Sequence, residues 1–138
     1  MRLVLDTNVV VSALLWDGTP ERLIDLAGEG TIELITSEAL LAELTRLLSR
    51  PKLAAKLTGD GESAAEIVAR YAELASVIGA PAVEEVRLRD PDDAVVLACA
   101  IGAHADAIVS GDKDLQTLGT YQGIPILSPA QCLQRLTK

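Results

Sequence analysis

The stretch Met1-Arg2-Leu3-Val4-Leu5-Asp6-Thr7-Asn8 decides the fold, because an apolar strand pattern runs directly into an acidic residue. A helix-like run follows from Val9 to Leu15. Open α/β sheets bind their ligands at the carboxyl ends of the strands, and Asp6 falls at such an end. Asp6 is therefore either an N-cap of the following helix, a position that favours Asp, or part of a functional site. Three further acidic segments in comparable settings favour the site.

Strand and helix patterns alternate along the whole chain. Short apolar runs typical of strands buried on both faces occupy residues 3–5, 32–35, 107–109 and 124–127, with a weaker candidate at 83–86. Helical patterns occupy residues 9–15, 20–27, 38–49, 63–77, 91–103 and 129–136. This alternation predicts an α/β fold with a mostly parallel sheet of four to five strands covered by helices.

Length and composition indicate an ordinary globular domain. The 138 residues fit one domain, residues 1–138, with a single core. Hydrophobic residues make up 49%, yet there is no Phe, one Trp and two Tyr, so aromatic stacking on bases is not expected as the main binding mode. Cys99 and Cys132 are far apart, which suggests neither a zinc site nor a disulfide. No run is long enough to span a bilayer and no signal pattern opens the chain, so we expect a cytoplasmic protein without a membrane partner.

The net charge of −8 argues against a broad surface for polyanions, whose binding normally rests on Lys and Arg. A polyanionic substrate is still compatible with this charge if several carboxylates hold a divalent cation, because the cation inverts the local potential. The basic residues Arg46, Arg50, Lys52 and Lys56 fall in one short segment. This segment is either a strip that contacts an RNA backbone or, more simply, a solvated helix face.

Glu43 is the second acidic candidate, in the helical pattern at 38–49. Five leucines of this pattern form one apolar arc, and Glu43 lies at the edge of the arc, whereas Glu38 points away from it. That position suits a carboxylate that faces a cleft. The alternative is an i, i+3 ion pair with Arg46.

The run Asp90-Pro91-Asp92-Asp93 opens the helical pattern at 91–103. Asp90 as N-cap, Pro91 at the first helical position and two acids in the first turn make a well-formed helix start without any function. The helix is nevertheless apolar nearly all round and should be buried, and Asp93 shares its side with the apolar residues one and two turns on. A carboxylate on a buried face needs a partner or a metal ion, so we favour Asp93 over Asp92 as a site residue.

The segment Ser110-Gly111-Asp112-Lys113-Asp114 follows the strand pattern at 107–109. Asp112, like Asp6, comes shortly after an apolar strand, and Gly111 permits a tight turn or a close approach of the backbone to a ligand. Ser110 could orient a carboxylate or a bound water, and Asp114 could be a first-turn acid of the next helix. Asp112 is therefore either another site carboxylate or an N-cap of that helix.

Taken together, the four acidic segments resemble the PIN-domain family of metal-dependent ribonucleases. No single motif is specific, but their order and spacing over residues 3–127 are. The motifs that carry the resemblance are Leu5-Asp6-Thr7-Asn8, Ser37-Glu38-Ala39-Leu40-Leu41-Ala42-Glu43-Leu44, Asp90-Pro91-Asp92-Asp93-Ala94-Val95-Val96-Leu97-Ala98-Cys99 and Val109-Ser110-Gly111-Asp112-Lys113-Asp114-Leu115. Many relatives have Thr in place of Ser110. Close relatives extend the acidic run where this chain has Ala94, which leaves open whether Asp92 or Asp93 is the ligand.

The resemblance implies a Rossmann-like, three-layer α/β/α sandwich whose acidic pocket holds Mg²⁺ or Mn²⁺. Carboxylates gathered in one pocket repel one another and need a cation, and such hard cations take oxygen ligands. The resemblance further implies hydrolysis of RNA, a toxin role in a type II toxin-antitoxin pair, an antitoxin partner and a homodimer. The implied roles are metal ligation by Asp6, Asp93 and Asp112, retention of a water or second ion by Glu43, an accessory role for Asp114, and positioning of carboxylates by Asn8 and Ser110.

Other classes of protein fit the chain less well. An aspartyl phosphatase also begins with a strand that ends in Asp, but its pattern has a second acid two residues on, where this chain has Asn8. A receiver-like phospho-acceptor has an early acid pair, which Thr7-Asn8 does not supply. The stronger alternative is a catalytically weak PIN-type scaffold that binds protein or RNA, which fits the few aromatic residues and the pI of about 4.5.

Overall fold

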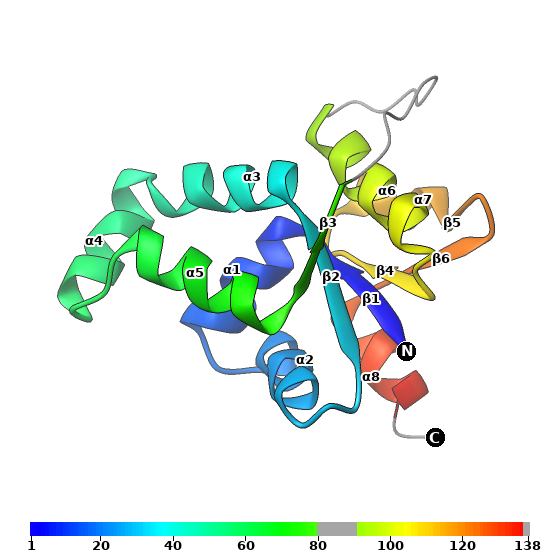
Figure 1. The fold of residues 1–138 in the computed structure, drawn as a ribbon, viewed down its shortest axis with the longest axis horizontal. Helices are drawn as coiled ribbons and strands as arrows, with labels where there is room; N and C mark the ends of the chain where they lie inside the picture. The colour runs from blue at the N-terminus through cyan, green and yellow to red at the C-terminus, as the bar shows by residue number, and fades with distance from the viewer. Residues whose placement is uncertain (80–90, 137–138) are drawn as a thin grey trace.

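A mostly parallel sheet forms the centre of the protein (Figure 1). The computed structural model describes residues 1–79 and 91–136. The strands in this part of the chain are β1 (Arg2–Leu5), β2 (Glu33–Ser37), β3 (Ser76–Ile78), β4 (Ala107–Val109), β5 (Thr120–Tyr121) and β6 (Ile124–Leu127). They form a six-stranded sheet in the order β3-β2-β1-β4-β6-β5, in which only β5 is antiparallel to its neighbour.

The central strands are buried on both faces, as their apolar runs predict. In β1, Leu3 and Leu5 lie in one core cluster and Val4 lies in the other. The neighbouring strand β4 repeats the pattern, with Val109 in the first cluster and Ile108 in the second. Successive side chains of a strand point to opposite faces, so the sheet separates two apolar cores and needs helices on both sides.

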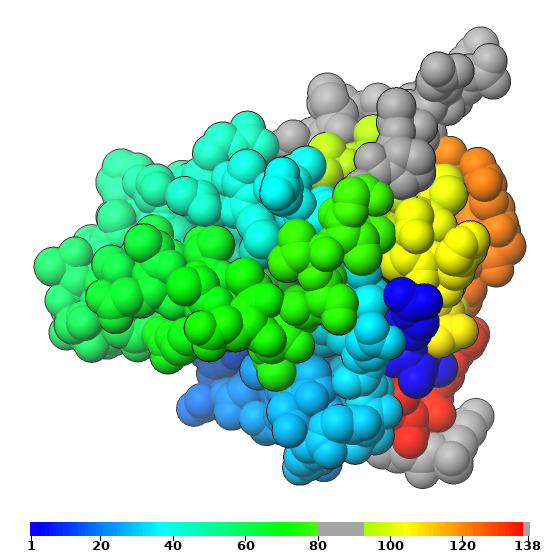
Figure 2. Space-filling model, viewed as in Figure 1, coloured from blue at the N-terminus to red at the C-terminus, as the bar shows by residue number. Residues whose placement is uncertain are grey.

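Helices cover both faces of the sheet. Those in the described ranges are α1 (Thr7–Leu15), α2 (Thr19–Gly28), α3 (Glu38–Leu48), α4 (Pro51–Gly59), α5 (Ala64–Leu74), α6 (Pro91–Ala103), α7 (Lys113–Leu118) and α8 (Pro129–Leu136). α6 and α7 pack on the Val4 side, α3 contributes leucines to both cores, and the other helices pack on the Leu3 side. Figures 1 and 2 show α3, α4 and α5 projecting from the sheet as an arm. Over residues 1–79 and 91–136, no helix is long and apolar enough to cross a membrane.

The prediction for residues 63–77 is wrong at its carboxyl end. α5 ends at Leu74, Ala75 is extended, and the next three residues form β3, which pairs with β2 at the sheet edge. Val77 and Ile78 are β-branched and favour extended backbone, and pairing with β2 outweighs the helical periodicity. Together with the two-residue β5, this strand gives the sheet six strands rather than four to five. The weaker strand candidate at 83–86 lies outside the described residues.

Candidate active site

The carboxyl ends of β1 and β4 bring the first and last acidic segments together. These strands are parallel neighbours, and the Asp6 amide donates a hydrogen bond to the Val109 carbonyl at 2.9 Å. The Ser110 hydroxyl donates to Asp6 Oδ2 at 2.8 Å and accepts from the Asp112 amide at 3.0 Å. Ser110 is fully buried, so it fixes the position of Asp6 relative to the Asp112 backbone.

The structure separates the capping and site interpretations of the two aspartates. Asp6 has the backbone position of an N-cap, but its side chain makes no capping hydrogen bond to α1. Asp112, by contrast, caps α7, because its Oδ1 accepts from the amides of Asp114 at 2.7 Å and Leu115 at 3.2 Å. Asp112 thus combines the N-cap role with a position close to Asp6, whereas Asp6 is not held there by capping.

Asp6 carries its carboxyl group in surroundings that disfavour a negative charge. Its residue is only 5% exposed, and this burial raises the pKa of the carboxyl above its ordinary value. Hydrogen bonds from Ser110 and Thr7 lower the pKa, and the nearby charge of Asp112 raises it, with burial the largest of these effects. A divalent cation at this position would stabilise the ionised form of Asp6 and offset the repulsion from Asp112.

Thr7 connects this pair of segments to Glu43 on α3. The Thr7 hydroxyl donates to Glu43 Oε1 at 2.7 Å and lies 3.5 Å from Asp6 Oδ1. A hydroxyl has one proton to donate, so the shorter contact identifies Glu43 as its main acceptor. Both Thr7 and Glu43 are buried. Thr7 was not among the predicted site residues, although a hydroxyl next to a strand-end carboxylate is a signal for such a role.

Replacing Thr7 with Val is expected to lower the stability of the fold and to disturb the position of the Glu43 carboxylate. Val keeps the shape of Thr but removes the donor to the Glu43 carboxylate, so we expect the free energy of unfolding to fall by about 1–3 kcal/mol. If Glu43 takes part in a metal site, loss of the group that orients it should lower the affinity for a divalent cation by about 10–100-fold. Chemical denaturation measures the first effect, and calorimetric titration with a divalent cation measures the second. Thr7→Ser keeps the hydroxyl and should behave like the native protein, and equal behaviour of both variants would contradict the positioning role.

Asp93 is buried at the start of α6, as its position on an apolar helix predicts. It is 4% exposed, whereas the side chain of Asp92 lies outside the described part of the structure. Across the described residues, no three Asp, Glu, His or Cys side chains are close enough together to form a metal site. The structure therefore brings Asp6 and Asp112 together, with Glu43 linked through Thr7, but it does not gather Asp93 with them into one ligand cluster.

The remaining predicted residues lie on the surface. Asn8 is exposed and lines a cleft beside Asp112, and Asp114 is exposed in the first turn of α7. Arg46 is exposed near the carboxyl end of α3, and Arg50 and Lys52 are exposed where α4 begins. A helix rises about 1.5 Å per residue, so this basic strip lies on the arm, some way from the strand ends. Its role as an RNA contact stays a prediction.

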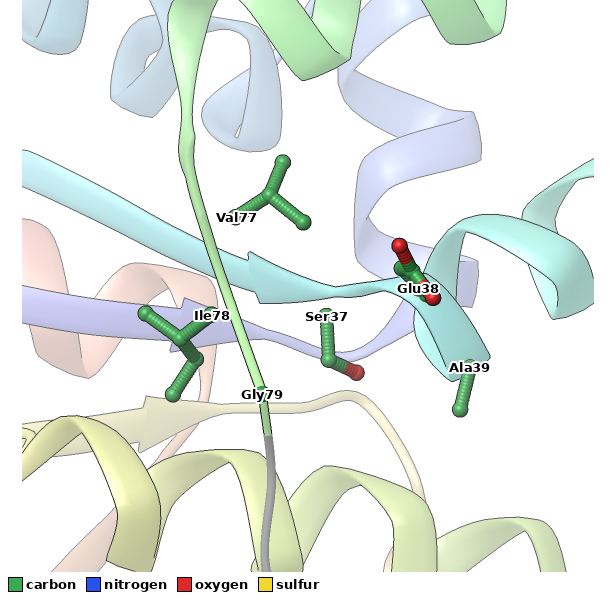
Figure 3. A pocket seen from close by; sticks show the side chains of 6 residues that line it. All are labelled: Ser37, Glu38, Ala39, Val77, Ile78 and Gly79. Carbon is green, nitrogen blue, oxygen red and sulfur yellow. The ribbon is translucent and has the colours of Figure 1, made fainter.

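A second hollow lies at the carboxyl ends of β2 and β3 (Figure 3). It has a volume of about 470 Å³ and is lined by Ser37, Glu38, Ala39, Val77, Ile78 and Gly79. The Ser37 hydroxyl accepts a hydrogen bond from the Leu40 amide and so caps α3. In Figure 3 the side chains of Ser37 and Glu38 point in different directions, so they do not converge on a common ligand.

The chemistry of the donor set fits a hard divalent cation. Asp6 and Asp112 offer carboxylate oxygens from adjacent strand ends, and Ser110 orders one of them. Mg²⁺ commonly binds through one or two carboxylates and keeps several waters, so a site of this kind does not need a complete protein cage. Asp93 and Glu43 are the buried carboxylates that such a site could add.

Comparison with known proteins supports the predicted family and fold. The family model described as PIN domain matches residues 2–114. The fold is similar, with a TM-score of 0.66 and 17% sequence identity, to a chain in the crystal structure of VapBC2 from Rickettsia felis bound to a DNA fragment from their promoter. That similarity covers 93% of this chain and 98% of the other. Among curated proteins, none matches the sequence. These findings confirm the resemblance and the α/β sandwich predicted from the sequence.

Proposed function

The chain belongs to the PIN-domain family, and from this premise we propose that it is an endoribonuclease that depends on Mg²⁺ or Mn²⁺ and hydrolyses RNA phosphodiester bonds. One observation carries the proposal. Asp6 is buried at the carboxyl end of β1, beside Asp112, and is held by Ser110. Such a carboxylate lowers the stability of the fold when it is ionised, whereas it is well suited to bind a cation.

In the proposed mechanism the protein supplies the ligands and their orientation. Asp6, Asp93 and Asp112 would hold the divalent ion, and Ser110 would keep Asp6 turned toward it. When bound, the ion supplies the positive charge that stabilises a phosphodiester as negative charge develops during hydrolysis. Glu43, oriented by Thr7, would retain the water that attacks the phosphorus or a second ion. Asn8 and Asp114, which are exposed, would act as accessory residues at the edge of the proposed metal site.

The proposed biological role is the toxin half of a type II toxin-antitoxin pair. The family gives the first support, and the fold shared with a chain of VapBC2, which was solved with a promoter fragment, gives the second. An antitoxin protein and a second copy of the chain are the expected partners, and RNA is the expected substrate.

The second candidate function is a PIN-type scaffold that binds protein or RNA without efficient catalysis. A specific observation favours it, since the described residues hold no ready cluster of three metal-ligating side chains. The two functions differ in what a metal ion does. A nuclease cuts RNA when the ion is present, whereas the scaffold binds its partner with or without it.

Single-turnover cleavage of a panel of structured RNAs, with Mg²⁺, Mn²⁺ or EDTA, tests the proposal directly. Cleavage that requires the ion supports the nuclease. Metal binding by calorimetry without cleavage of any RNA would favour the scaffold instead. Cleavage that continues in EDTA would contradict metal dependence.

The pH dependence of cleavage should respond to Ser110. Asp6 must be ionised to bind a cation, so activity falls as the pH drops through its raised pKa. The Ser110 hydrogen bond lowers this pKa, so Ser110→Ala raises it further. We therefore expect the acidic limb of the rate profile to move to higher pH in Ser110→Ala and to stay in place in Ser110→Thr, which keeps the hydroxyl. An unchanged limb in Ser110→Ala would mean that another group controls it.

A further inference from the structure

A cleft opens beside the acidic pair, on the side of α1, α2 and α8. It has a volume of about 350 Å³ and is lined by Asn8, Val9 and Ser12 of α1, Pro20 of α2, Gly111 and Asp112 after β4, and Pro129 of α8. This volume lies near the lower end of the range of roughly 300–1,000 Å³ for small-ligand sites. Asp112 belongs to both the cleft and the proposed metal site, so the two are directly adjacent.

The lining of the cleft favours a neutral ligand that combines hydrogen-bonding groups with apolar surface. The residues with polar side chains along it are Asn8, Ser12 and Asp112, while Val9 and the two prolines are apolar. Among the described residues that line it, none is Lys or Arg, so a phosphate group would meet the negative charge of Asp112 and no positive charge from these residues. An amide presents a donor and an acceptor side by side, the arrangement with which Asn recognises the edge of a base.

We propose that this cleft binds the unpaired nucleobase next to the scissile phosphate and that Asn8 and Ser12 contact its edge. The proposal rests on the ribonuclease function proposed above. Proteins that read single-stranded RNA hydrogen-bond the edges of bases that have left the stack. In this chain, which has no Phe, apolar contact with Val9, Pro20 and Pro129 takes the place of aromatic stacking.

The position of the cleft next to Asp112 indicates that the bound base would belong to a nucleotide that flanks the cleaved bond. A metal site that includes Asp112 would hold the scissile phosphate beside the mouth of the cleft, and the cleft has room for a base attached to a flanking nucleotide. Asn8 is exposed and Ser12 is half-buried, so both side chains are accessible from the cleft. The cleft would then impose a preference for the base at one position flanking the cut.

Cleavage of abasic RNA tests this preference. The probe is an RNA that the native protein cuts at one mapped bond, together with two versions that each lack one base flanking that bond. We expect one abasic version to be cut about 10-fold more slowly than the intact RNA. The Ser12→Leu variant, in which the leucine fills the cleft, should cut the intact RNA at that reduced rate. It should no longer distinguish the intact RNA from the abasic version that the native protein cuts slowly. Equal cleavage of all three RNAs by the native protein would overturn the proposal.

Ser49→Leu provides the matched control, because it adds the same side chain at an exposed position at the end of α3. It should retain the native preference for the intact RNA. Thermal unfolding of both Leu variants establishes that each is folded before rates are compared. Ser12→Ala, which removes only the hydroxyl, should lose part of the preference without filling the cleft.

Nucleoside binding gives a test that does not depend on cleavage. The four ribonucleosides and free ribose are added at millimolar concentration to the isotope-labelled native protein, and amide resonances are followed by NMR. At least one nucleoside should shift the amides of Asn8, Ser12 and Gly111, ribose should not, and Ser12→Leu should abolish the shifts. If no RNA is cut but these shifts occur, the ribonuclease function fails and the base site stands. If RNA is cut and no nucleoside shifts these amides, only the base site is overturned.

Discussion

Asp6→Asn is expected to lower the single-turnover rate of RNA cleavage by at least about 100-fold. Residues that merely orient a metal ligand contribute about 10–100-fold, so loss of a ligand should cost no less. Asn has the size of Asp and can still accept the hydrogen bond from Ser110, so the site should keep its shape. Rates with Mg²⁺ and Mn²⁺, measured on the same RNA panel, check the expectation. Native-like cleavage by this variant would indicate a contaminating nuclease or a different site.

The same substitution should make the metal-free protein more stable at neutral pH. The pKa of Asp6 is raised in the folded protein, so folding disfavours its ionised form. A group of this kind stabilises the fold at pH values below the pKa that it has in the unfolded chain. This contribution is lost as the pH rises through the higher pKa that it has in the folded protein. Asn carries no charge and avoids this loss. Thermal unfolding in EDTA should show a higher midpoint for Asp6→Asn, whereas added Mg²⁺ or Mn²⁺ should raise the midpoint of the native protein more.

Asp93→Asn is expected to have a comparable effect on cleavage, at least about 100-fold, while Asp92→Asn should change the rate only a few-fold. The two substitutions make the same chemical change at neighbouring positions, so each serves as the control for the other. Asp93 is 4% exposed on a helix that packs against the sheet, and adjacent residues of a helix point about 100° apart.

Single-turnover rates and the increase in thermal stability on adding metal should both single out Asp93. The opposite pattern, with Asp92→Asn inactive and Asp93→Asn active, would identify Asp92 as the ligand. Equal and small effects of both would remove the start of α6 from the proposed metal site.

Much of the fold can be predicted because its signals are local. Pro91 and Pro129 mark where α6 and α8 begin, and both helices have the predicted bounds. The strand runs at 107–109 and 124–127 are also found as predicted. β3 escapes prediction because it is a three-residue edge strand whose first two side chains are exposed, so it shows no buried periodicity. Its existence depends on pairing with β2, which local sequence does not encode.

For the candidate site, the sequence predicts where the carboxylates lie but not how their side chains are used. The strand-end positions of Asp6 and Asp112 can be read from the sequence, because parallel neighbouring strands end at the same edge of a sheet. Residue preferences alone cannot distinguish a cap from a site, since Asp6 and Asp112 both suit an N-cap and only Asp112 uses its side chain as one. The contact between Thr7 and Glu43 depends on how α3 packs beside α1, and no local pattern specifies it.

The hydrogen bond between Asp6 and Ser110 joins residues 104 positions apart in the chain. During synthesis, a growing polypeptide therefore carries Asp6 long before Ser110 and Asp112 exist. Contacts between such distant segments form late in folding, because the intervening chain must first be brought together. If the protein is a nuclease, growing chains that do not yet contain Ser110 and Asp112 lack the complete site and are harmless to the cell that makes them. The site would be assembled only when β4 docks against β1.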